Sequence, residues 1–483
     1  MTAAPGSAGS FEDLCLRAHE EARRRRRPVM VSWHEDPARC AIDVPALLAA
    51  VADDRRRAFV WSSRWSGLTI LGVGTALDLH GHGVDRFTQV GRSWRRHLTT
   101  SMSNAPSPHS PEHPARPLLV GGFAFQADAG HPLGAFPDGL MWVPEAQLTW
   151  TSPQSPLLTL NAQVAESDDP VAVAERARTS ARVLAGRPQP AAGPDPLAEL
   201  VQELPSAREW RALVLDARKA IEAGPLTKVV LSRQLLLRTH GPQVAGHALR
   251  HLLASQDTGA VFGVRLAQRW FLGATPECLV RLRAGEVRTH GLAGSAPRHA
   301  DPVDDERYAD WLRTDPKIHR EHAVVTAHVE RKLRDVCTDV QTGGGNPVLK
   351  LPHVQHRQTD IRAVVRQPPQ GGLLELARLL HPTPAVGGHP GHLALDWLAR
   401  HEPFDRGWYA GPVGWMDSRS EGELAVAIRS AAVSGHRAAV YAGCGIVSGS
   451  DPDEEYAESS LKMRTMLAAL GVPIRTGHTG TTA

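Results

Sequence analysis

The sequence has no strong excess of charge, no membrane-length apolar run and few cysteines. Its 54 Lys and Arg residues stand against 51 Asp and Glu, which leaves no broad basic face for nucleic acid. No apolar run is long enough to span a bilayer, and residues 1–10 lack a signal-peptide pattern. The five cysteines are scattered, odd in number and without CxxC spacing. This excludes a disulfide framework or zinc knuckle and favours the cytoplasm.

What is present is the composition of a globular protein, with 42% hydrophobic and 22% charged residues. Helices are predicted at residues 11–27 and 41–53, and β-rich stretches at 58–77, 117–126, 140–150 and 157–164. The segment Asn104 to Pro117, rich in Pro, Ser and His, is predicted to be an exposed loop, and Ala185 to Pro196 a linker. This first half offers no motif with recognisable chemistry.

The second half opens with a capping box, Ser206 with Glu209, followed by apolar residues at helical spacing. A strand is then predicted at 226–237, with Lys228 in an apolar stretch. A lysine there can lie at a sheet edge and extend to water. Alternatively, it is a buried amine whose charged form is disfavoured, so that it can serve as a base. The residues alone do not separate the two interpretations.

Two further charged groups fall on apolar patterns. A helix predicted at 316–336 places Glu321 on the same face as Val325, Val329 and Leu333. Such a carboxylate needs a partner, which can be a bound cation or a salt bridge with an Arg or His of a neighbouring element. Strands are predicted at 260–266, 269–282, 404–417 and 422–433, and the last contains Arg429 in an otherwise apolar run. That guanidinium is either paired or available to a carboxylate ligand.

The most informative stretch is residues 441–462, YAGCGIVSGSDPDEEYAESSLK. A short strand turns through glycines into a helix with Asp451 as N-cap, Pro452 at its first position and Glu454 completing a capping box. Glu455, Glu458 and Lys462 share one face of this helix. The pattern fits either a solvated face with an ordinary Glu–Lys pair or a site for a metal ion and a small anion.

Eight motifs in succession resemble the chorismate-utilising enzymes, which include anthranilate synthase component I, and most closely their isochorismate synthases. The motifs are KVVLSR, FLGATPE, THGLAGSAPR, KIHREH, LHPTPAVGG, FDRGWYAGPVGW, AIRS and the stretch just described. The similarity is dense from about Ala207 to Leu470. It implies an α/β fold, of the α+β type, with a layered, mostly antiparallel sheet core wrapped by helices. We expect flexible tails at 1–10 and 471–483, and an N-terminal portion, 11–200, that forms one domain with a catalytic portion, 201–470.

The resemblance also implies a function and a site. The reaction would be the Mg²⁺-dependent, reversible conversion of chorismate to isochorismate, feeding menaquinone or siderophore synthesis. Lys228 would be the base that activates water at C2, and Glu277 the acid that protonates the departing C4 hydroxyl. Glu321 and Glu458 would bind the metal, with Glu455 assisting. Substrate-lining positions would be Gly294, Ser295, His356, Thr383, Tyr409, Arg429, Gly445 and Lys462. We expect a monomer whose only partner is its small-molecule substrate.

Some residues depart from the family pattern or separate its members. The family usually has threonine where this chain has Ser295, an acidic residue where it has Ile318, and an apolar residue where it has Arg357. None of these differences removes a proposed catalytic group. Lys228 favours water over ammonia as nucleophile, since anthranilate synthases have glutamine there, and Ala293 argues against aminodeoxychorismate synthase. Salicylate synthase, which also eliminates pyruvate, stays open. A catalytically inactive binding protein is disfavoured because the proposed base, acid and carboxylates are all present.

Overall fold

The computed structural model describes residues 9–35, 47, 51, 55–104, 117–127, 136–151, 156–185, 198–241, 243–344, 347–366 and 372–472. The predicted helix at 41–53, the loop from Asn104 to Pro117, the linker and both tails lie wholly or largely outside these residues. In the part described, none of the helices combines the length and apolarity needed to cross a membrane.

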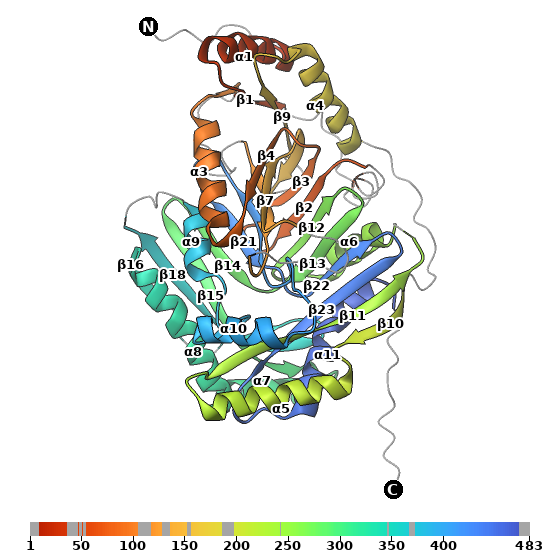
Figure 1. Ribbon diagram of the computed structural model, residues 1–483, viewed down its shortest axis with the longest axis vertical. Helices are drawn as coiled ribbons and strands as arrows, with labels where there is room; N and C mark the ends of the chain where they lie inside the picture. The colour runs from red at the N-terminus through yellow and green to blue at the C-terminus, as the bar shows by residue number, and fades with distance from the viewer. Residues whose placement is uncertain are drawn as a thin grey trace.

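Two large sheets form the centre of the molecule (Figure 1). Within the described residues the larger has 13 strands, with β19 (Gly388–His389) pairing with β11 beside the main order. That order is β10 (Ala198–Leu204), β11 (Lys228–Thr239), β23 (Arg437–Ile446), β22 (Ser430–Ser434), β13 (Arg269–Thr275), β12 (Ala260–Leu266), β2 (Ala58–Ser63), β3 (Thr69–Val73), β8 (Ala146–Trp150), β9 (Leu157–Val164), β1 (Val29–Glu35) and β5 (Ser101–Ser103).

The smaller sheet has 10 strands in the same residues, with β17 (Val348–Lys350) pairing with β18 beside the main order. That order is β16 (Cys337–Thr342), β18 (Val354–Val365), β15 (Glu286–Pro297), β14 (Cys278–Arg283), β21 (Gly422–Val426), β20 (Pro412–Met416), β6 (Leu119–Phe123), β7 (Gly139–Val143) and β4 (Leu77–Gly81). Neighbouring strands of both sheets are antiparallel, except that β1 and β5 are parallel. The predicted layered, mostly antiparallel α/β fold is therefore confirmed.

Helices cover the sheets. They are α1 (Phe11–Arg25), α3 (Arg86–Leu98), α4 (Pro170–Leu184), α5 (Ala207–Ala223), α6 (Val244–Ser255), α7 (Pro302–Thr314), α8 (Pro316–Arg334), α9 (Leu373–Leu380), α10 (Gly391–His401) and α11 (Pro452–Ala469), with a 3₁₀ turn, η1 (Gly83–Asp85). Figure 1 shows α5, α7, α8, α10 and α11 at one end of the molecule and α1 and α4 at the other. Among the functional residues predicted from the sequence, Glu321 lies on α8, and Glu455, Glu458 and Lys462 lie on α11.

The core divides along the larger sheet because successive side chains of a strand face opposite ways. On β2, Phe59 and Trp61 belong to an apolar cluster between the sheets, which also holds Trp415 and Leu424 of the smaller sheet. Val60, between them, faces a second cluster formed with α1, α4, α6 and the end of α11. Both faces of the larger sheet are therefore buried at β2.

The predicted helix caps are confirmed, with one exception. Ser206 and Glu209 form the complete capping box at α5. At α11, Asp451 accepts hydrogen bonds from the backbone N–H groups of Asp453 and Glu454, and Pro452 holds the first helical position. The return bond from Glu454 that a capping box needs is not present, so that part of the prediction is wrong.

Two predicted strands are each broken where the chain passes from one sheet to the other. The stretch at 269–282 is β13 in the larger sheet and β14 in the smaller, and Glu277 lies at the break. The stretch at 422–433 is β21 in the smaller sheet and β22 in the larger, broken around Arg429. Arg429 is therefore not inside a strand, and its φ of 52° is left-handed. Because β13 pairs with β22 and β14 with β21, the two breaks lie side by side.

Candidate active site

A cavity of about 380 Å³ opens at this seam between the sheets. The chain passes from one sheet to the other at Glu277 and again at Arg429, and these two points are called the first and second crossing. Backbone hydrogen bonds join them, because Val426 N–H donates to the carbonyl of Glu277 and Ala274 N–H to that of Arg429. The structure brings together all the predicted site residues except Thr383 in the cavity lining, which includes Lys228, Glu277, Gly294, Ser295, Glu321, His356, Tyr409, Arg429, Gly445, Glu455, Glu458 and Lys462.

Lys228 begins strand β11, which lies between β10 and β23. Its side chain is only 3% exposed, so the interpretation as a sheet-edge lysine in water does not hold. The ammonium Nζ donates to Glu321 Oε1 at 2.7 Å, reaching across to helix α8. Gly445 leaves the room for this pair, because a Cβ there would lie 2.7 Å from Lys228 Cε and 2.8 Å from Glu321 Oε1.

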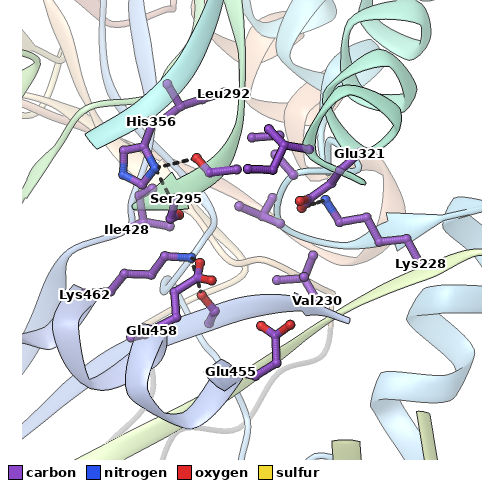
Figure 2. Close-up of a pocket in the computed structure, with 18 of the residues that line it drawn as sticks. Lys228, Val230, Leu292, Ser295, Glu321, His356, Ile428, Glu455, Glu458 and Lys462 are labelled. Carbon is purple, nitrogen blue, oxygen red and sulfur yellow. Dashed lines mark hydrogen bonds and ion pairs between the residues drawn. The ribbon is translucent and has the colours of Figure 1, made fainter. Parts of the chain in front are cut away.

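A second lysine–carboxylate pair lies on α11. Lys462 Nζ is 2.6 Å from Glu458 Oε1 and donates to the carbonyl of Gly443 at 3.0 Å. Burial alone would lower the pKa of Lys462, but the charge of Glu458 outweighs it and raises that pKa. Burial alone would likewise raise the pKa of Glu458, whereas Lys462 holds it below the ordinary value. The expected Glu–Lys pair is thus present, but it faces the cavity (Figure 2).

Glu455, one turn before Glu458, forms no ion pair with any residue that the structure describes, although the positive charge of Lys317 acts to lower its pKa. Burial raises its pKa, and the negative charges of Glu458 and Glu321 raise it further. A divalent cation would remove this repulsion, and carboxylate oxygens are the donors that Mg²⁺ prefers. The donor set therefore fits the predicted metal. Glu321 faces the same cavity but on the opposite side, held by Lys228 (Figure 2).

Glu277 lies at the first crossing, directly after β13. It is 5% exposed, and its backbone N–H donates to the hydroxyl of Thr275. Burial raises the pKa of its carboxyl to about 7, although the positive charges of Lys228 and Lys462 oppose the effect. Near neutral pH a substantial fraction of this carboxyl carries a proton, as a general acid must.

A polar chain runs from the second crossing across to β15. Arg429 Nη2 lies 2.9 Å from His356 Nε2. Because a guanidinium can only donate, this Nε2 is an acceptor and the proton sits on Nδ1. From there it reaches the carbonyl of Gly294 and the hydroxyl of Ser295, both at 3.1 Å. Burial, reinforced by Arg429, lowers the pKa of His356 far below its usual range, so the ring is neutral.

The wall beside Arg429 is aromatic. Tyr409 stacks on Tyr441 with 5.1 Å between ring centroids, and burial raises the pKa of Tyr409 to about 12. Its hydroxyl therefore keeps its proton and can donate to an anionic ligand. Burial also lowers the pKa of Arg429 to about 10, at which the guanidinium is still charged at neutral pH.

Thr383 lies next to the cavity rather than in its lining. It is 6% exposed, and its hydroxyl acts on Glu277 in the direction that lowers the pKa of this carboxyl.

Sequence reasoning missed Arg406, which also lines the cavity. It pairs with Glu402 at 2.6 Å and donates to the carbonyl of Val386 at 2.9 Å. Its guanidinium lies 4.3 Å from the centre of the Phe125 ring. No local sequence signal pointed to Arg406, because Glu402 and Arg406 lie in the irregular segment after α10, where a spacing of four does not indicate a helical ion pair.

Ile318, which replaces the acidic residue usual in the family, has a packing role in the structure. Gly294 has a φ of 78°, and a Cβ there would lie 2.6 Å from Ile318 Cγ2. Ile318 thus covers the glycine whose carbonyl accepts the proton of His356.

Comparison with known proteins gives a consistent result. Residues 17–471 match the chorismate binding enzyme family. The isochorismate synthase MenF of Bacillus subtilis is 34% identical, with 86% of this chain and 88% of that protein covered. The salicylate biosynthesis isochorismate synthase of Pseudomonas aeruginosa is 34% identical, with 97% of this chain and 96% of that protein covered. The structure of MenF, the menaquinone-specific isochorismate synthase of Escherichia coli, is 27% identical with a TM-score of 0.75 and covers 94% of this chain and 99% of that one.

Proposed function

The chain belongs to the chorismate binding enzyme family, and we propose that it is an isochorismate synthase. It would add water at C2 of chorismate and release the C4 hydroxyl as water, reversibly. The observation that carries the proposal is one cavity that holds both a buried lysine, Lys228, and a buried carboxyl, Glu277, whose pKa is raised by burial. These are the base and the acid that this exchange requires.

The cavity suits a substrate with two carboxylates. Arg429 and Tyr409 would supply donors for the pyruvyl carboxylate. Glu455 and Glu458 on one side of the cavity and Glu321 on the other (Figure 2) would hold Mg²⁺, which supplies positive charge for the ring carboxylate. The proposed binding surface is completed by Lys462, Gly294, Ser295, His356 and Gly445 in the lining, and by Thr383, whose hydroxyl acts on Glu277.

Proton movement follows from the positions of the two groups. Lys228 takes a proton from water while the water oxygen bonds to C2, and Glu277 gives its proton to the hydroxyl that leaves C4. The ring double bond shifts between these positions. Each group ends in the opposite protonation state, so the reverse reaction exchanges their roles. Lys228 donates to Glu321 in the structure, and must give up this bond to act as a base.

One incubation tests the proposal. Purified protein is mixed with chorismate and Mg²⁺, and the products are separated by chromatography without a coupling enzyme. The expected result is a chorismate–isochorismate mixture of the same composition when approached from either compound. Stoichiometric salicylate and pyruvate would replace the proposal by salicylate synthase, and no consumption of chorismate would favour an inactive binding protein.

The proposal extends to the setting of the enzyme. We infer a cytoplasmic monomer whose product feeds menaquinone or siderophore synthesis. Size-exclusion chromatography with light scattering tests the oligomeric state, and a dimer would refute it.

A further inference from the structure

Strand β11, which begins with Lys228, is paired unevenly along one of its sides. Its other side pairs with β23 over most of its length. On the uneven side, β19 pairs with Lys228 and Val229, and β10 pairs from Gln234 onward. Between these two stretches, at residues 230–233, no strand that the structure describes pairs with β11 on this side. These four residues are buried, so their backbone groups need other partners.

A buried ion pair fills this gap. Glu402 Oε1 accepts the backbone N–H of Ser232 at 2.8 Å. Arg406 Nη2 donates to the carbonyl of Val230 at 2.5 Å. The guanidinium also binds both carboxylate oxygens of Glu402, at 2.6 and 2.8 Å, and the two side chains are only 3% and 6% exposed. In the gap, the ion pair thus takes the place of a neighbouring strand.

Arg406 also contacts two further elements beside the cavity. Its Nη1 donates to the carbonyl of Val386 at 2.9 Å, and the Val386 N–H donates to the carbonyl of Thr383 at 3.1 Å. Thr383 is the residue whose hydroxyl acts on Glu277. The backbone carbonyl of Arg406 accepts from the N–H of Tyr409 at 2.9 Å. Arg406 therefore joins β11, the turn that begins at Thr383 and the backbone of Tyr409.

We propose that Arg406 is a positioning residue of the active site and that Glu402 holds it in place. Its bonds fix how Lys228, Glu277 and Tyr409 lie relative to one another. This role rests on the proposed function, in which these groups are the base, the acid and a donor to the pyruvyl carboxylate. Lys228 lies two residues before the carbonyl that Arg406 holds, and a displacement of about 1 Å can cost about a hundredfold in rate.

Two variants separate positioning from stability. Arg406→Met leaves the Glu402 carboxylate buried without its partner, which should lower Tm by about 3 to 5 °C. Adding Glu402→Gln should recover part of this loss, because no charge is then buried and glutamine can still accept from Ser232. The carbonyls of Val230 and Val386 lack their donor in both proteins. We therefore expect kcat for chorismate to be lower by about a hundredfold in both.

Arg298 supplies a matched control. It pairs with Asp305 at 2.8 Å and donates to the carbonyl of Leu351 at 2.8 Å, but it is not among the residues that line the cavity. Arg298→Met should lower Tm and leave kcat of the folded protein nearly unchanged. A double variant at Glu402 and Arg406 that regains kcat together with Tm would overturn the proposal. So would losses of kcat that merely follow Tm across all three proteins.

Hydrogen exchange tests the contact without chorismate. Mass spectrometry follows the peptides that cover residues 228–233 in the unmodified protein, in Arg298→Met and in Glu402→Ala, which removes the acceptor of Ser232 N–H. We expect faster exchange in Glu402→Ala alone, and unchanged exchange there would overturn the proposal. If Arg406→Met does not fold, Arg406→Lys replaces it, because lysine keeps the charge but not the planar set of donors.

The two measurements also separate this role from the proposed function. Turnover of chorismate with unchanged exchange would retain the function and remove the role of the ion pair. A protein that exchanges as expected but does not convert chorismate would lose the proposed function and keep the ion pair as the support of β11.

Discussion

Replacing Glu277 by Gln should stabilise the protein at alkaline pH while abolishing its activity. The carboxyl has an ordinary pKa of 4.5 and a folded-state value of about 7, raised by burial. Between these values the folded protein holds a proton that the unfolded chain has released. Stability therefore falls as pH rises through this window, and the loss is complete above about pH 8.

The size of the effect follows from the same two values. At about 1.4 kcal/mol per pH unit, the raised pKa of Glu277 costs the folded protein about 3 kcal/mol at pH 8, where the carboxyl is mostly ionised. At pH 5, where the carboxyl takes up a proton on folding, the cost is about 1 kcal/mol. Glutamine has the same shape and no charge, so the variant escapes this cost. An unfolding entropy of about 2 cal/mol/K per residue gives about 1 kcal/mol/K for 483 residues. The expected gain in Tm is therefore about 3 °C at pH 8 and about 1 °C at pH 5.

Differential scanning calorimetry in EDTA at both pH values checks this result. Glu20→Gln, at an exposed position on α1, serves as control and should give no difference between the two pH values. A Glu277→Gln variant that gains the same amount at pH 5 and pH 8, or that loses stability at pH 8, would refute the reasoning. Together with lost turnover, the expected outcome would show an acid retained for chemistry at the expense of stability.

The remaining predictions concern turnover. Glu458→Gln should weaken Mg²⁺-dependent activity about tenfold to a hundredfold, whereas Glu454→Gln, at the exposed start of α11, should leave turnover nearly intact; comparable losses would reject the metal assignment. Excess EDTA should stop turnover and added Mg²⁺ restore it, so full turnover in EDTA would contradict a metal requirement. Lys228→Gln should lower kcat by about a hundredfold or more. Its Tm should be no lower than that of proteins in which another buried residue is replaced, and a near-normal kcat would show that Lys228 is not the base. Arg429→Lys should raise KM for chorismate, because lysine cannot offer the paired donors of a guanidinium. In the chorismate-to-isochorismate direction, kcat/KM should fall as pH rises through about 7, where Glu277 loses its proton, and a flat profile across this range would argue against Glu277 as the acid.

Sequence periodicity predicted which side of an element a residue occupies. Glu321 was placed on the apolar face of its helix, and Val325, Val329 and Leu333 are indeed buried. The start of a helix was also predicted from the local sequence, since Asp451 is the N-cap of α11 and Pro452 its first residue, as expected. Both signals depend on residues only three or four positions apart, which is the range over which a helix repeats.

Partners that lie far apart in the sequence were not predictable in this way. Glu321 was expected to meet a metal or an Arg or His, and in the structure it meets Lys228, 93 positions away. Cys444 seemed an isolated cysteine until the packing of β23 against α11 brought it to Glu455. Hydrophobic pattern indicates that a buried charge needs a partner, but the fold alone decides which residue supplies it.

The two sheet crossings show most clearly where pattern stops being informative. An apolar run of strand-forming residues looks the same whether it stays in one sheet or passes between two buried sheets. At Glu277 the preceding Thr-Pro pair hinted at a break, but at Arg429 nothing in the apolar run did, because the left-handed φ of 52° belongs to a non-glycine residue. Residues in such conformations persist only where the surrounding structure holds them. Here the hydrogen bond from Ala274 to the carbonyl of Arg429 fixes the turn, and the guanidinium is thereby directed to His356 and the cavity. The Glu277 carboxyl and the Arg429 guanidinium thus depend on the same pair of crossings, so disruption of one crossing should displace both groups.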